Sequence, residues 1–330
     1  MLDFAAMRVT RIAAVVFGLL TTWASYEAQA PRQPGQYALG PDSLPQEGVP
    51  KGRLEGPTVF KSKIIGNTTR QYWVYVPAQY DPARPANVLV FQDGQRATPA
   101  NGALRVPQVL ENLIHKKEIP VTIGIFITPG QRGDAYPETI GTGNGNNRAQ
   151  EYDSLTDTYA RFIVEEMLPE VGKTYNLTSD PAGRAIGGTS SGAIAAFTVA
   201  WQRPDQFRNV VSFIGSYTSI GYRPAANGQP MVAGGDLYPT LIRKNPIKPI
   251  RIFLQDGSAD LDNEHGSWFL ANQQMLAAFQ YANRTADSRN NPGPRYDVNH
   301  VWGDGAHSDA HGGSILPDVL RWIWRDAAKN

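Results

Sequence analysis

The sequence predicts an α/β protein in which helices cover both faces of a mainly parallel sheet. Short apolar runs such as VLVF at 88–91 and VTIGIFI at 121–127 are typical of strands that are buried on both faces. From residue 88 onward these runs alternate with helical segments, an order that builds parallel strands joined by right-handed crossovers. Because ligands in such sheets bind beyond the carboxyl ends of the strands, the loops that follow the strands are where chemistry is expected.

An antiparallel hairpin is expected ahead of the parallel strands. Residues 58–65 and 71–76 are rich in β-branched and aromatic side chains, and a Gly-Asn-Thr turn separates them. Further strands are expected at 88–91, 121–127, 184–187, 210–214, 250–254 and 296–301. Helices are expected at 106–115, 153–171, 193–202, 238–243, 268–281 and 314–327, with a long loop at 130–150.

The composition excludes several other classes of protein. The 330 residues are 41% hydrophobic, and 31 Lys and Arg oppose 30 Asp and Glu for a net charge of +1. A disordered chain is less hydrophobic, and a nucleic-acid-binding domain usually carries a basic excess, so we expect no nucleic-acid partner. The chain has no cysteine, which excludes disulfides, zinc–thiolate sites and cysteine nucleophiles. A covalent catalyst must therefore be Ser, Thr, Lys, Asp or Glu.

The first thirty residues have the pattern of an export signal. Arg8 and Arg11 precede an apolar run at 12–24, and Ala28 and Ala30 form an A-x-A cleavage site. The run is about 13 residues long, shorter than a membrane span of about 20 residues, so we expect no span in the mature chain. An uncleaved anchor is the alternative. We predict a signal peptide over 1–30, an extended Pro- and Gly-rich arm over 31–55 and one enzyme domain over 56–330, exported to the periplasm or the extracellular space.

The clearest motif is G-T-S-S-G at residues 188–192. A predicted strand enters it and a predicted helix leaves it, so its small residues allow a sharp turn that exposes the central hydroxyl group. We predict Ser190 as a nucleophile and the backbone N–H of Ser191 as an oxyanion donor; an ordinary glycine-rich turn is the alternative. A second donor is expected after the strand at 88–91, from the backbone near Gly94 and Gln95, with a simple Asp-Gly turn as the alternative.

A serine nucleophile needs a base and an acid, and in hydrolases with this turn both follow it along the chain. His307 lies in a loop directly after the last predicted strand, so we favour it as the base, with His311 as the alternative. The loop after the preceding strand holds Asp256, Asp260 and Asp262. We predict Asp260 as the acid that orients the imidazole, with Asp256 and Asp262 as the alternatives; the favoured roles of these two are to brace the turn and to cap the next segment.

A metal site is the competing interpretation for part of this set. His307, Asp309 and His311 form an H-x-D-x-H cluster, and imidazole and carboxylate groups suit zinc or manganese. The cluster has no further histidine nearby, and a catalytic histidine loop explains it. We therefore predict no metal and no cofactor.

Substrate recognition is expected from the long loop, because it lies over the predicted strand ends. Arg148, Glu151 and Tyr152 are the candidate contacts, with an Arg148–Glu151 ion pair as the favoured structural alternative. Trp302 is a candidate for an aromatic wall of the cleft, and a place in the core is its alternative.

Several stretches resemble the putative-esterase family of α/β-hydrolases, which includes enterochelin esterase, esterase D and feruloyl and acetylxylan esterases. The stretches are RQYWVYVPAQYD at 70–81, VLVFQDGQ at 88–95, the elbow region at 165–207, IFLQDGSADLDN at 252–263 and VWGDGAH at 301–307. The resemblance implies an α/β-hydrolase fold with Ser190 as nucleophile, Asp260 as acid and His307 as base. The family often reads G-G-H where this chain reads G-A-H followed by S-D-A-H-G-G, which keeps His311 open as the base.

These observations predict an exported serine carboxylesterase that acts through a Ser-His-Asp triad and an acyl-enzyme. Its partner is expected to be a small-molecule or carbohydrate ester, and the family implies feruloyl or acetyl esters of sugars or a siderophore-type ester. An acyltransferase on the same scaffold and a non-catalytic sugar- or partner-binding protein are the alternatives. The complete set of Ser, Asp and His argues against the non-catalytic alternative. The sequence does not indicate an oligomeric state.

Overall fold

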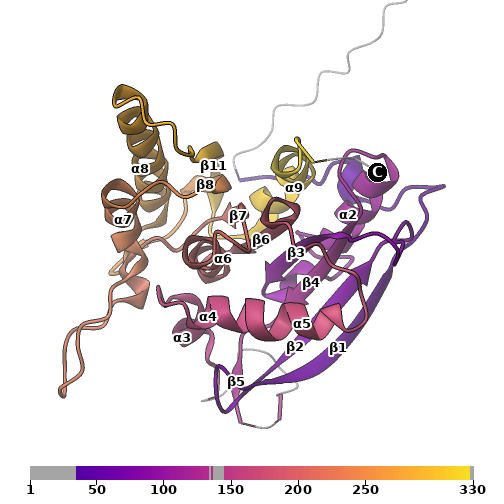
Figure 1. Cartoon of the computed structure of the whole chain (residues 1–330), viewed down its shortest axis with the longest axis horizontal. Helices are drawn as coiled ribbons and strands as arrows, with labels where there is room; N and C mark the ends of the chain where they lie inside the picture. Colours follow the sequence, from indigo (N-terminus) through magenta and orange to yellow (C-terminus); the bar gives the residue numbers. More distant parts are fainter. Residues whose placement is uncertain (1–34, 134, 137–144, 328–330) are drawn as a thin grey trace, which may run out of the picture. The chain divides into compact units, whose positions relative to one another are not determined.

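The computed structural model describes residues 35–133, 135–136 and 145–327, and its centre is a nine-stranded sheet (Figure 1). The strand order is β1-β2-β4-β3-β6-β7-β8-β11, with β5 paired to β2. β1 (Arg53–Ser62) and β2 (Thr68–Val76) form the expected antiparallel hairpin. β2 also runs antiparallel to β4, and the pairings from β4 across to β11 are all parallel. The predicted mainly parallel α/β fold is therefore confirmed.

The other elements follow the expected alternation. The remaining strands are β3 (Asn87–Gln92), β4 (Thr122–Ile127), β5 (Gln131–Arg132), β6 (Arg184–Thr189), β7 (Asn209–Phe213), β8 (Arg251–Ala259), β9 (Asp262–Asn263), β10 (Gly266–Ser267) and β11 (Asp297–Ala306). The helices are α1 (Gly94–Ala97), α2 (Val106–His115), α3 (Arg148–Tyr152), α4 (Thr158–Arg161), α5 (Leu168–Gly172), α6 (Ser191–Gln202), α7 (Tyr238–Lys244), α8 (Trp268–Ser288) and α9 (Asp309–Ile323). Short 3-10 turns lie at Pro41–Ser43, Pro181–Gly183, Ser219–Gly221 and Gly235–Leu237.

Apolar layers lie on both faces of the sheet, as the alternation of side chains along β3 shows. Val88 and Val90 belong to the layer that includes side chains of α6 and α8. Leu89 and Phe91 belong to the layer that includes side chains of α2 and α9. Successive residues of a strand point to opposite faces, so an uninterrupted apolar run such as VLVF serves both layers.

The helix expected over 153–171 is divided. The chain breaks after α3, resumes at Thr158 as α4, continues through a π-helical turn (Phe162–Met167) and ends as α5. Pro169 lies in the first turn of α5 and has no N–H to donate, so the regular hydrogen-bond ladder is interrupted at this place. The last helix, α9, begins at Asp309 rather than at Ser314, which places His311 inside a helix.

The described part of the N-terminal arm contacts the end of β11 and the first turn of α9. The Tyr37 hydroxyl donates to Oδ1 of Asp304 at 2.6 Å, and the Tyr37 ring stacks on His311 with centroids 4.0 Å apart. The predicted signal peptide, residues 1–30, and part of the predicted long loop, 137–144, lie outside the described residues. Within the described ranges, every helix is too short or too polar to cross a bilayer.

Candidate active site

Ser190 occupies the sharp turn between β6 and α6. Its backbone has φ 58° and ψ −125°, a conformation that residues with a side chain rarely adopt. The turn is held by the Ser190 N–H, which donates to the Phe213 carbonyl oxygen, and by the Ser216 N–H, which donates to the Ser190 carbonyl oxygen. Gly188 allows the close approach, because a Cβ there would lie 2.5 Å from the backbone carbonyl of Gly192. The turn therefore presents the Ser190 hydroxyl at the carboxyl end of β6.

Ser190, His307 and Asp260 form a chain of hydrogen bonds. Oγ of Ser190 lies 2.9 Å from Nε2 of His307, and Nδ1 of His307 lies 2.5 Å from Oδ1 of Asp260. Ser190, Asp260 and His307 are the residues that directly follow β6, β8 and β11, so they meet at the carboxyl ends of these parallel strands. The His307 side chain is 22% exposed, whereas the Asp260 side chain is fully buried. The structure thus brings together the three residues that were predicted as a triad; their catalytic roles remain a prediction.

His311 is not part of this series of hydrogen bonds between Ser190, His307 and Asp260. It is buried in α9, and its Nδ1 lies 2.9 Å from Nε2 of Gln255. Asp309, the middle residue of the H-x-D-x-H cluster, forms an ion pair with Arg96 at 2.8 Å. Among residues 35–133, 135–136 and 145–327, no group of three His, Asp or Glu side chains is arranged to hold a metal ion.

A second carboxyl group lies behind Asp260. Asp256 is fully buried, and it accepts the Gly257 N–H at 2.7 Å and the Asn272 amide at 2.6 Å. Burial raises the pKa of Asp256 to about 9, and the hydrogen bond with Asp260 and the charge of Asp260 act in the same direction. Burial also raises the pKa of Asp260, but hydrogen bonds from His307 and Asp256 outweigh this and leave it below its usual value. At neutral pH Asp256 is therefore neutral and Asp260 is charged.

The loop after β3 lies beside the elbow. Asp93 adopts the left-handed conformation with φ 54° and ψ 53°, and α1 begins directly after it. Gly192 of the elbow approaches closely, since a Cβ on it would lie 3.1 Å from Oδ2 of Asp93. Gly94 must also lack a side chain, because a Cβ there would lie 2.8 Å from the backbone carbonyl carbon of Phe126. The structure therefore brings the loop that was predicted to supply an oxyanion donor against the nucleophile turn.

The predicted oxyanion donors lie in the first turns of two helices. Ser191 is the first residue of α6, and Gly94 and Gln95 are the first residues of α1. Backbone N–H groups in a first turn have no partner within their own helix, so they are available to a ligand. Their use as an oxyanion hole stays a prediction.

Arg148 is bound to Asp93. Its Nε and Nη2 donate to Oδ1 and Oδ2 of Asp93 at 3.0 and 2.7 Å. Glu151 instead accepts from the buried guanidinium of Arg70 at 2.8 Å. The expected Arg148–Glu151 ion pair is therefore wrong, because each of the two side chains pairs with a residue from another part of the fold.

The other predicted substrate contacts, Glu151, Tyr152 and Trp302, are buried or half-buried among other side chains. Glu151 and Tyr152 are both buried, which leaves their side chains almost no surface for a substrate. Their role as substrate contacts stays a prediction. Trp302 is half-buried against Phe269 of α8, with ring centroids 5.9 Å apart. As a wall of the cleft, Trp302 stays a prediction.

Sequence reasoning missed Ser216. Its Oγ lies 3.2 Å from Oγ of Ser190 and accepts the indole N–H of Trp268 at 3.0 Å. The Trp268 ring in turn lies edge-on to His307, with centroids 5.8 Å apart. No local motif marks these residues, because the loop after β7 and the start of α8 meet the elbow only in the folded chain.

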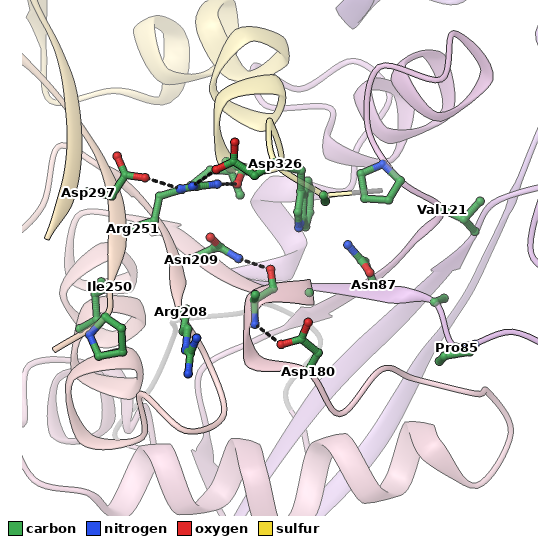
Figure 2. A pocket seen from close by; sticks show the side chains of 18 of the residues that line it. Pro85, Asn87, Val121, Asp180, Arg208, Asn209, Ile250, Arg251, Asp297 and Asp326 are labelled. Atoms are coloured by element: carbon green, nitrogen blue, oxygen red, sulfur yellow. Dashed lines mark hydrogen bonds and ion pairs between the residues drawn. The ribbon is translucent and has the colours of Figure 1, made fainter. Parts of the chain in front are cut away.

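A pocket of about 590 Å³ lies at the amino ends of the parallel strands, opposite the ends that carry Ser190 (Figure 2). It is lined by residues at the amino ends of strands, among them Asn87 of β3, Asn209 of β7 and Arg251 of β8. Arg251 forms ion pairs there with Asp297 and Asp326. Since the Ser190 chain lies beyond the carboxyl ends of the strands, this pocket is not the place of its chemistry.

A family model described as "Putative esterase" matches residues 62–310, and the chain belongs to this family. The family places the chain among the carboxylic ester hydrolases, and the fold is that of an α/β-hydrolase.

Two solved structures and one curated relative illustrate the similarity. An enterobactin esterase from Shigella flexneri has a TM-score of 0.62 and 21% identity, over 90% of this chain and 63% of that chain. A ferulic acid esterase from Anaeromyces mucronatus, solved in complex with ferulic acid, has a TM-score of 0.60 and 17% identity, over 88% of this chain and 97% of that chain. A Bacillus subtilis (strain 168) protein described as uncharacterized is 23% identical over 149 residues, which are 45% of this chain and 57% of that protein. The chain thus spans less than two thirds of the enterobactin esterase and of the Bacillus protein.

Proposed function

We propose that this protein is a serine carboxylesterase in which Ser190 is the nucleophile, His307 the general base and Asp260 the acid that orients the imidazole. The observation that carries the proposal is the hydrogen-bonded chain from Ser190 Oγ through His307 to Asp260, at 2.9 and 2.5 Å. A serine, an imidazole and a buried carboxylate joined in this order can perform the proton transfers that ester cleavage requires.

The chemistry follows from these positions. Oγ of Ser190 attacks the ester carbonyl carbon while Nε2 of His307 takes the hydroxyl proton. The N–H groups of Ser191 and of the Gly94–Gln95 turn stabilise the oxyanion of the tetrahedral intermediate. The intermediate collapses with cleavage of the ester C–O bond, and the imidazolium protonates the leaving alcohol. A water molecule, deprotonated by the same imidazole, then attacks the acyl-enzyme; the bond between the carbonyl carbon and Oγ breaks, the imidazolium returns the proton to Oγ of Ser190, and the carboxylic acid leaves.

The substrates that we propose are feruloyl or acetyl esters of sugars, or a siderophore-type ester. The family supports an ester, and the fold is shared with an enterobactin esterase and with a ferulic acid esterase. We also propose that the protein is exported, on the pattern of residues 1–30. N-terminal sequencing of protein recovered from the periplasm or the medium is expected to begin just after Ala30; recovery of an intact N-terminus from the cytoplasm would refute export.

Hydrolysis of p-nitrophenyl acetate and methyl ferulate tests the triad. Ser190→Ala and His307→Ala are each expected to lower kcat by more than ~10³-fold, because each removes a group that takes part in bond making or proton transfer. His311→Gln is the matched control, since His311 contacts Gln255 rather than Ser190, and we expect it to stay active. Wild-type rates for Ser190→Ala would contradict the proposal, and an inactive His311→Gln beside an active His307→Ala would transfer the base role to His311.

A further inference from the structure

We propose that Asp256 is a positioning residue of the triad: as a neutral carboxylic acid it donates a hydrogen bond to Oδ2 of Asp260 and so fixes the carboxylate that orients His307. This inference rests on the proposed function and deepens it. It assigns a second carboxyl group to the same site, with a protonation state opposite to that of the first.

The two oxygens of Asp260 have unequal surroundings. Oδ1 lies 2.5 Å from Nδ1 of His307 and accepts the backbone N–H of Leu261 at 2.6 Å. Oδ2 is buried, and within the described residues no N–H group or alcohol donates to it. A buried carboxylate oxygen without a donor is strongly unfavourable. Asp256 and Asp260 interact closely enough to raise the pKa of Asp256 and to lower that of Asp260, so a protonated Asp256 carboxyl group can supply the missing donor.

The other contacts of Asp256 direct that proton toward Asp260. Gly257 donates its N–H to Oδ1 of Asp256, and the Asn272 side chain donates to Oδ2. The Asn272 amide cannot be reversed, because its NH₂ group also donates to the carbonyl oxygens of Gly215 and Trp268 at 2.9 and 3.0 Å. Since both neighbours are donors, neither accepts the Asp256 proton, and the Asp260 carboxylate does.

The surroundings keep Asp256 neutral. It lies on β8, in register with Trp302 of β11, and faces Asn272 of α8; both of these partners are uncharged. Among the described residues Asp260 is the charged group that acts on it, and His307 lies beyond Asp260. Burial and the nearby negative charge together hold the pKa of Asp256 at about 9.

A proton-donating Asp256 has consequences that a passive structural side chain does not have. Above pH 9 Asp256 ionises, its hydrogen bond is lost, and two carboxylates repel each other behind His307, so the rate of hydrolysis should fall. In addition, Asp256 takes up a proton on folding between its ordinary pKa of 3.8 and its folded-state pKa of about 9. Its contribution to stability is therefore fully present below the lower value and is lost as pH rises toward the upper one.

Asp256→Asn is the informative variant, because it keeps the volume, a donor and one of the two acceptor oxygens but cannot ionise. We expect its kcat/KM for methyl ferulate to stay within about threefold of wild type at pH 7 and to lack the wild-type decline near pH 9. Asp256→Ala removes the donor and is expected to lower kcat by ~10–100-fold, since a misplaced Asp260 misplaces His307. Asp262→Asn neutralises an exposed carboxylate on β9, shortly after Asp260, and is the matched control, with the wild-type pH profile.

Urea unfolding between pH 5 and pH 10 gives a second readout that does not depend on catalysis. The unfolding midpoint of wild type should fall relative to that of Asp256→Asn as pH rises toward 9, and Asp262→Asn should follow wild type. An active Ser190→Ala would refute the triad yet leave this difference in place, so the two failures are distinguishable. The inference is overturned if Asp256→Asn loses as much kcat as Asp256→Ala, if it keeps the alkaline decline, or if its unfolding follows the wild-type pH dependence.

Discussion

Replacing Arg148 by alanine tests whether this residue serves the loop after β3 or the substrate. Its guanidinium makes two charge-assisted hydrogen bonds to Asp93, at 3.0 and 2.7 Å. The Asp93 side chain is 3% exposed and the Arg148 side chain 26%. Removal of one partner from a fully buried ion pair costs about 3–5 kcal/mol. Because Arg148 is partly exposed, water can enter its place, and we expect Arg148→Ala to lower the free energy of unfolding by about 2–3 kcal/mol.

The catalytic effect of Arg148→Ala should appear in kcat. Without its partner, the buried Asp93 carboxylate turns toward water, and the left-handed turn that places Gly94 and Gln95 relaxes. Loss of one oxyanion donor costs about 10²–10³ in kcat, so a displaced donor loop should cost ~10–100-fold. KM should stay near the wild-type value, because the guanidinium is engaged with Asp93 rather than with the substrate.

Urea unfolding and steady-state kinetics with methyl ferulate measure these two effects. Asp93→Asn and the double variant complete a thermodynamic cycle, in which we expect a coupling energy of about 1–3 kcal/mol between the two side chains. A raised KM with an unchanged kcat would refute the reasoning, since that pattern indicates lost substrate binding and would return Arg148 to the substrate site. Additive effects in the cycle would equally show that the ion pair does not hold the loop.

Two further substitutions test the nucleophile turn. Ser216→Ala removes a hydroxyl group that lies 3.2 Å from Oγ of Ser190. We expect kcat to fall by roughly tenfold at constant KM, as for the loss of a hydrogen bond of about 1–1.5 kcal/mol. An unchanged kcat would show that Ser216 and its Trp268 donor only pack there. Gly188→Ala places a Cβ 2.5 Å from the Gly192 backbone, so α6 must shift. We expect thermal unfolding to show a loss of stability of about 1–3 kcal/mol, together with a lowered kcat. Wild-type stability and kcat would mean that the turn tolerates a side chain.

Local sequence pattern is sufficient to predict those candidate functional residues that directly follow strands. Ser190, Asp260 and His307 could be singled out because each lies just beyond an apolar run, and parallel strands bring such loops to one edge. The same reasoning places the loop after β3 beside the elbow. The predicted elements also agree with the structure where an apolar run is bounded by turn residues, as in β3 and β4.

Contacts between distant segments could not be predicted in this way. Arg148 is three residues from Glu151, and the spacing favoured their pairing, yet its partner is Asp93, which no periodicity connects to it. The protonation of Asp256 depends on its burial and on its contacts with Asp260 and Asn272. Neither the burial nor these contacts can be predicted from the local sequence.

The position of His311 was misjudged for a different reason. The pair Gly312–Gly313 resembles a loop, but both glycines lie inside α9. They are needed for close packing, since a Cβ on Gly312 would lie 2.5 Å from the Phe213 ring and one on Gly313 would lie 2.1 Å from the Ala103 carbonyl oxygen. Glycine therefore marks helix contact here rather than a turn.

The position of β11 in the strand order has a consequence for how the protein loses activity. β11 is the outermost strand, hydrogen-bonded to β8 on one side, whereas β6 lies inside the sheet. Edge segments fray at a lower free energy than the centre of a fold. His307 should therefore detach while Ser190 is still held in place, and Tyr37, which bonds to Asp304 of β11, works against that fraying. Heat is then expected to inactivate the protein reversibly, by release of one edge, before the sheet as a whole melts.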